Sequence, residues 1–174
     1  MHARFLKFVL VMSVVWLAGC SSNVRVDSDT QASYRYSGEK YGKVVATMAD
    51  SVASDVDKAT RFQQLGLEQA IISRLKQENL YDAQSGNTVN VVVNSLRVRN
   101  AASAIMFGAM AGSDNMEGSV TLKAPDGKVL NKFTIDASYA LGGFAGGQNS
   151  SRLGYLGQTF GELTAKTILD KERK

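Results

Sequence analysis

The chain has 174 residues, enough for one domain with a hydrophobic core and too few for two. Its formal charge is +4, but residues 1–19 hold Arg4 and Lys7 and no acidic residue, so the rest carries 18 basic against 16 acidic side chains. With so small an excess of positive charge, we expect no nucleic-acid partner.

The first 19 residues have the composition of a secretory signal. Two basic residues precede an apolar run from Phe8 to Trp16, and small residues follow this run. The run is shorter than the roughly 20 apolar residues that cross a bilayer as a helix. We therefore expect residues 1–19 to be a cleaved signal peptide.

The end of this segment, Leu17-Ala18-Gly19-Cys20, resembles the lipobox of bacterial lipoproteins. The resemblance implies that Cys20 becomes the new N-terminus and carries diacylglycerol and a further acyl chain such as palmitate. It also implies the outer membrane rather than the inner one, because Ser21 follows the cysteine where an aspartate would signal retention. The expected location is the periplasmic face of the outer membrane, where several acyl chains would hold the protein stably.

Cleavage would remove the only histidine, His2, and the only tryptophan, Trp16, and lipidation would consume the only cysteine. Serine-histidine-aspartate and cysteine-histidine hydrolases and histidine or thiolate zinc sites are thereby excluded. A carbohydrate hydrolase that uses only carboxylates remains an alternative. Its candidate acids, Asp114, Glu117 and Asp136, have no spacing that forces them together. We expect no enzyme activity and no cofactor.

Residues 20–43 are polar and serine-rich and predict a lipidated tether, with an edge strand through Tyr34–Tyr36 as the alternative. A globular domain over residues 44–174 is expected to begin with a strand at Val44–Met48. Asp50, Asp55 and Asp57 follow, but their spacing does not fit a calcium loop, and we expect a solvated loop that caps a helix and binds no metal.

The middle of the chain shows a helical and then a strand pattern. Apolar residues recur at helical spacing over Thr60–Glu78, and Thr88–Val98 is valine-rich, as in a central strand. Alternating residues on both sides of Pro125-Asp126-Gly127 predict a β-hairpin with strands over residues 117–124 and 128–140.

A second helix is expected over Ser151–Lys171. Gly154, Gly157 and Gly161 weaken it by up to about 1 kcal/mol each relative to alanine, so they predict close approach of another backbone. The predicted fold class is α/β (α+β): a single domain of β-α-β-β-β-α order, with two helices packed on a mixed or antiparallel sheet.

Two segments rich in small residues, 101–112 and 141–147, follow predicted strands. Their glycine spacing fits neither a phosphate loop nor a dinucleotide fingerprint, so nucleotide binding is not expected. Three interpretations stay open: the segments pack on each other, bind a second copy or an envelope protein, or insert into the membrane. The candidate contact surface consists of Ile105, Met106, Phe107, Met110 and Phe144.

The order of these elements resembles a family of small bacterial lipoproteins catalogued as a domain of unknown function. The resemblance covers about Val44 to Leu169 and depends on Phe107-Gly108-Ala109, the stretch Val120–Leu130 and Gly142-Gly143. It implies no activity. We expect a non-enzymatic binding or assembly module of the outer membrane. The alternative is a membrane-inserting or oligomerising lipoprotein, because the element order is also distantly similar to lipoproteins of the curli-secretion type.

Overall fold

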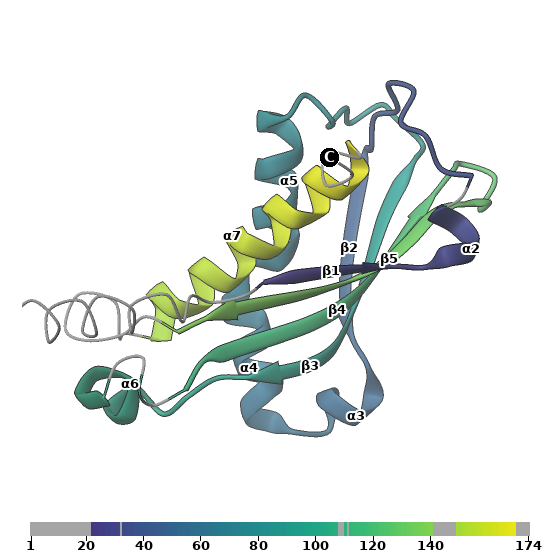
Figure 1. Cartoon of the computed structure of the whole chain (residues 1–174). Coiled ribbons are helices and arrows are strands. Elements are labelled where there is room, and N and C mark those ends of the chain that lie inside the picture. Colours follow the sequence, from purple (N-terminus) through teal and green to yellow (C-terminus); the bar gives the residue numbers. More distant parts are fainter. Residues whose placement is uncertain (1–21, 32, 108–109, 111, 141–148, 170–174) are drawn as a thin grey trace, which may run out of the picture.

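The computed structural model describes residues 22–31, 33–107, 110, 112–140 and 149–169. One five-stranded mixed sheet has the order β1-β5-β4-β3-β2, in which β2 and β3 pair in parallel and the other neighbours pair antiparallel. Helices α4, α5 and α7 pack on the sheet, which confirms the predicted fold class (Figure 1). The elements are β1 (Asn23–Val26), α2 (Ser28–Gln31), β2 (Lys43–Met48), α3 (Asp50–Ala53), α4 (Val56–Leu65), α5 (Leu67–Gln77), β3 (Thr88–Arg97), α6 (Ala101–Phe107), β4 (Asp114–Lys123), β5 (Val129–Tyr139) and α7 (Asn149–Ile168).

The predicted hairpin is β4 and β5, and its turn lies where the sequence places it. Gly127 has φ of 86°, and its N–H donates to the carbonyl of Ala124 at 3.0 Å. Along β4 every second residue is buried, so that Val120 and Leu122 face the helices while Ser119 and Thr121 face the other way. The alternation therefore gives the sheet one core face and one polar face.

The helix predicted over residues 60–78 is two helices, because the chain bends at Gly66. Gly66 has φ of 55°, a left-handed conformation that glycine adopts without strain, and it ends α4 immediately before α5 begins. Asp55 caps α4 by accepting a hydrogen bond from the Lys58 N–H at 3.2 Å. The aspartate-containing loop thus caps a helix, as predicted.

Two of the three glycines named for α7, Gly157 and Gly161, lie against other backbones as predicted, whereas Gly154 has open space around it. A Cβ built on Gly161 would lie 2.9 Å from the Ala70 carbonyl oxygen on α5, and one on Gly157 would lie 3.1 Å from the Leu65 carbonyl oxygen on α4. A methyl group at these positions would push the helices apart, so the glycines set the distance between α7 and its helical neighbours.

The segment predicted as a tether belongs largely to the fold. Strand β1 begins at Asn23 and pairs with β5, with Val24 opposite Ile135. Further along, the buried Tyr34 donates its hydroxyl to the Ile168 carbonyl at 3.1 Å, and Tyr41 is fully buried. A tether over residues 20–43 is therefore wrong from Asn23 onward, because apolar side chains in this polar stretch pack on the core. The edge strand lies at Asn23–Val26, not at Tyr34–Tyr36.

The antiparallel pairing of β1 places its first residue at one particular end of the sheet. There the Ser138 N–H donates to the Ser22 hydroxyl at 3.1 Å, and Ser138 lies opposite Asn115 on β4. The end of β3, the beginning of β4, the end of β5 and α6 all lie at this end, at the left of Figure 1. We call it the α6 end of the domain.

Candidate functional site

Helix α6 projects beyond the ends of β3 and β4 (Figure 1). It carries large apolar side chains that are exposed to solvent. Its first turn is fixed by Asn100, whose side chain accepts a hydrogen bond from the Ala102 N–H at 2.8 Å. After this turn Met106 is 75% exposed, Phe107 58% and Met110 93%. We refer to Met106, Phe107 and Met110 as the apolar tip.

The structure places most of the predicted contact residues on or beside this helix. Ile105 is half-buried, and the three residues of the apolar tip are exposed. Phe144 lies outside the described residues, as does the glycine-rich stretch over residues 141–147. Whether these side chains contact a partner stays a prediction.

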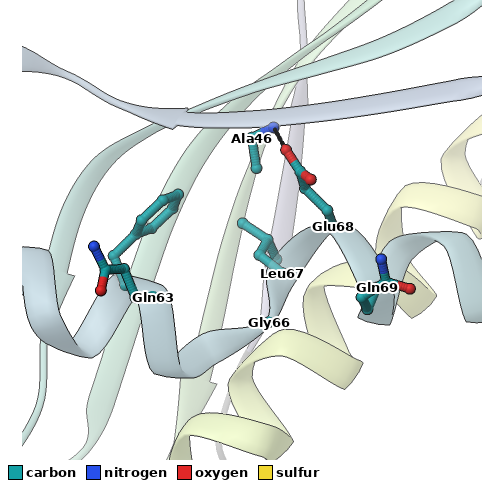
Figure 2. Close-up of a pocket in the computed structure, with 7 residues that line it drawn as sticks. Ala46, Gln63, Gly66, Leu67, Glu68 and Gln69 are labelled. Carbon is teal, nitrogen blue, oxygen red and sulfur yellow. Dashed lines mark hydrogen bonds between the residues drawn. The ribbon is translucent and has the colours of Figure 1, made fainter.

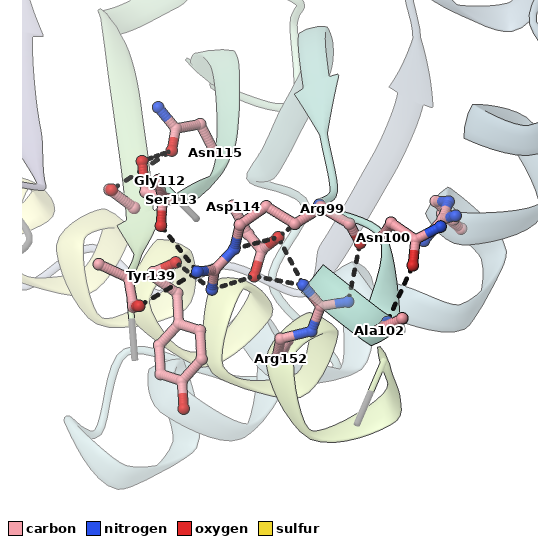
Figure 3. Close-up of polar contacts among 12 residues, drawn as sticks. Arg99, Asn100, Ala102, Gly112, Ser113, Asp114, Asn115, Tyr139 and Arg152 are labelled. Atoms are coloured by element: carbon pink, nitrogen blue, oxygen red, sulfur yellow. Dashed lines mark hydrogen bonds and ion pairs between the residues drawn. The ribbon is translucent and has the colours of Figure 1, made fainter. Parts of the chain in front are cut away.

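A buried ion network lies directly beneath α6 (Figure 3). The Asp114 carboxylate, fully buried at the beginning of β4, accepts hydrogen bonds from the Arg99 backbone N–H at 2.7 Å and from Arg99 Nη2 at 3.1 Å. Arg152 on α7, also fully buried, donates from Nη1 to both carboxylate oxygens at 2.9 and 3.1 Å. One carboxylate therefore joins two guanidinium groups from different elements.

The same guanidinium groups hold both ends of the segment that carries the apolar tip. Arg99 Nη1 donates to the Gly112 carbonyl at 2.7 Å, and Arg152 Nη2 donates to the Arg99 carbonyl at 2.9 Å. Arg99 also donates to the Tyr139 carbonyl, at the end of β5. Arg99 and Gly112, on the two sides of this segment, are thus held at one point of the domain.

Such a network is expensive to assemble, because each charge must lose its water. Removing one partner from a buried pair costs about 3–5 kcal/mol. In this domain the network positions a segment whose exposed side chains are apolar. An exposed apolar segment held in this way is a candidate contact surface.

One protein-family model matches residues 15–143, and its description is "Domain of unknown function (DUF4410)". The chain belongs to the DUF4410 family. The match confirms the predicted membership of an uncharacterised family, and its range includes β1 as well as the α6 segment. No curated protein matches the chain.

Two solved structures are similar to this DUF4410 chain, both described as PelC dodecamers from Paraburkholderia phytofirmans. One, a variant with a single substitution, is 13% identical with a TM-score of 0.45, and the match covers 82% of this chain and 97% of that chain. The other is 11% identical with a TM-score of 0.42, and the match covers 86% and 98% of the two chains. These TM-scores are too low to carry an inference about this chain.

The three candidate acids do not form one site in the DUF4410 domain. Asp114 is on the core face of β4, inside the ion network, whereas Glu117 is on the polar face. The register does bring Glu117 opposite Asp136 on β5, a proximity that the sequence spacing did not predict. Glu117 forms an ion pair with Arg25 at 2.5 Å.

Two of the three acids considered and rejected as calcium ligands form ion pairs with cations of α4. Asp55 pairs with Lys58 at 3.3 Å, and Asp57 with Arg61 at 2.7 Å. The backbone hydrogen bond from Lys58 lowers the pKa of Asp55. Within the described ranges there is no group of three or more histidine, cysteine or acidic residues that could hold a metal ion.

A cavity of about 230 Å³ lies between β2 and the bend from α4 to α5 (Figure 2). Its one carboxylate, Glu68, accepts a hydrogen bond from the Ala46 N–H at 2.8 Å. Ala46 is on β2, which lies at the other edge of the sheet from β1 and whose free N–H groups would otherwise be available to pair with another chain. Glu68 therefore protects a sheet edge, and the one carboxylate of this cavity has a structural role.

Proposed function

We propose that this DUF4410 protein is a lipid-anchored lipoprotein of the outer membrane and that its domain is a non-enzymatic binding or assembly module. The lipobox ending at Cys20 supports the anchor, and the serine after it supports the outer membrane. Without residues 1–19 the chain has no histidine, which supports a role other than catalysis. The apolar tip is the contact surface of the module.

One observation carries the contact surface: three exposed apolar side chains on a segment that a buried ion network fixes at both ends. Exposed apolar side chains are common singly, but a group of large ones close together marks a place of contact. Methionines also adapt to irregular partner surfaces, because their side chains are unbranched and polarizable. These residues indicate a partner whose contacting surface is apolar and uncharged.

The anchor is tested by comparing the wild type with Cys20→Ser in intact cells. We expect the wild type to have the mass of an acylated chain beginning at residue 20 and to fractionate with the outer membrane. Cys20→Ser should lack the acyl mass and should no longer fractionate with the outer membrane. A wild type without acyl mass would refute the anchor.

The contact surface is tested by placing a photo-crosslinking amino acid at position 107 and, as a control, at position 129. Val129 is 43% exposed but lies beside the hairpin turn, at the opposite end of β5 from the α6 end. We expect adducts from position 107 and not from position 129. Equal yields at both positions would refute a specific contact at the apolar tip.

A further inference from the structure

Given the proposed lipid anchor, we propose that the apolar tip inserts into the same membrane leaflet that holds the acyl chains of Cys20. The partner of the contact surface is then lipid, and the domain has two attachments to one membrane. The inference rests on the proposed function and on where the fold places the beginning of β1.

The distance between the two attachments follows from chain geometry. Cys20 lies two residues before Ser22, and two residues of extended chain span about 7 Å at most. Ser22 contacts Ser138 on β5, and β4 is the next strand, so the base of the α6 segment lies on the order of 10 Å away across two strand spacings. An anchor at Cys20 would therefore hold the α6 end of the domain against the membrane.

The chemistry of the segment suits a lipid environment. Residues 100–113 contain no charged side chain, and the flanking Arg99 and Asp114 bind each other in the core. A seven-residue helix is about 10 Å long, which fits the shallow zone of about 5–10 Å that interfacial segments occupy. No described helix is long and apolar enough to cross a membrane.

The area of the apolar tip also favours lipid over a second protein. Three side chains with these exposures offer on the order of 400 Å², whereas a stable protein interface uses about 800 Å² from each partner. A leaflet needs no minimum matching area, because each buried side chain adds its transfer free energy independently. The tip is large enough to orient an anchored domain.

The test uses tryptophan fluorescence, because the only tryptophan, Trp16, lies in the segment expected to be cleaved. The lipidated full-length product of Phe107→Trp is reconstituted in vesicles of phosphatidylethanolamine and phosphatidylglycerol with brominated acyl chains. Val129→Trp, at the opposite end of the domain, is the matched control. We expect a blue shift and quenching by the brominated chains at position 107, and neither effect at position 129.

Two results would overturn insertion. In the first, the tryptophan at position 107 stays accessible to an aqueous quencher while the protein is bound to vesicles. In the second, it becomes protected without vesicles as the protein concentration rises, which would mean that a second copy covers the tip.

A second measurement separates the insertion from the anchor. The Cys20→Ser, Phe107→Trp protein without residues 1–19 has neither an acyl chain nor Trp16, and its vesicle binding should fall on the order of 10-fold when Met106 or Met110 is also changed to Ser. Unchanged binding would refute insertion even where the wild type is acylated. A wild type without acyl mass would refute the proposed function, and the unanchored protein would still decide whether the tip enters lipid.

Discussion

Replacing Asp114 with Asn tests whether the ion network supports the fold. The carboxylate accepts hydrogen bonds from Arg99 and Arg152 on both oxygens, at 2.7–3.3 Å. An amide has similar shape but no charge, and its NH2 group would face guanidinium donors that are within 3.1 Å of Oδ2. Two buried guanidinium groups would lose their shared carboxylate, and we expect a loss of about 3–5 kcal/mol.

Such a loss is a large part of the 5–15 kcal/mol that stabilises a typical domain. For a chain of this size it should lower Tm by roughly 6–20 °C, since about 1 kcal/mol corresponds to 2–4 °C. The assay is thermal unfolding followed by circular dichroism on Cys20→Ser protein without residues 1–19. Glu117→Gln is the matched control: it makes the same chemical change on the same strand, in an exposed pair with Arg25 worth less than about 1 kcal/mol. If Asp114→Asn destabilises the protein no more than Glu117→Gln does, the network does not support the fold.

Three further predictions concern packing, catalysis and alkaline stability. Gly161→Ala should lower the urea midpoint by the equivalent of about 1–3 kcal/mol, because its methyl group would meet the α5 backbone, whereas Gly154→Ala, with open space around it, should raise stability by up to about 1 kcal/mol. The double variant Glu117→Gln, Asp136→Asn should retain the cellular phenotype of the wild type. Loss of that phenotype would support the alternative of a carbohydrate hydrolase. Burial raises the pKa of Tyr41, so its stabilising contribution is complete below pH of about 10 and is lost as the pH rises further; Tyr41→Phe should unfold at higher pH than the wild type in an alkaline titration.

The hairpin and the terminal helix could be predicted because their signals are local. Pro125-Asp126-Gly127 specifies a turn between two alternating strands, and the structure has this turn. Gly157 and Gly161 are costly inside a helix, and the backbones of α4 and α5 explain them. In each case neighbouring residues contained the information.

The ion network and β1 could not be predicted in this way. Asp114 is 15 residues from Arg99 and 38 from Arg152, and each is an ordinary surface residue by composition. The available signal was that Arg99 and Asp114 flank a stretch without charges. Strand β1 has four residues, and its partner lies more than a hundred residues further along. No local pattern specifies a pairing of that kind.

The pairing of β1 with β5 also determines when the domain can take up its orientation. Asn23 lies opposite Asp136, so the first strand to be translated waits for the last strand before it can join the sheet. Loop closure over this separation is slow compared with forming the β4–β5 hairpin. A chain that is anchored at Cys20 before β5 has folded would have no fixed orientation relative to the membrane. Under the proposed anchor, the pairing of β1 with β5 would fix the domain close to Cys20, so the domain would acquire its orientation at the membrane only when the sheet is complete.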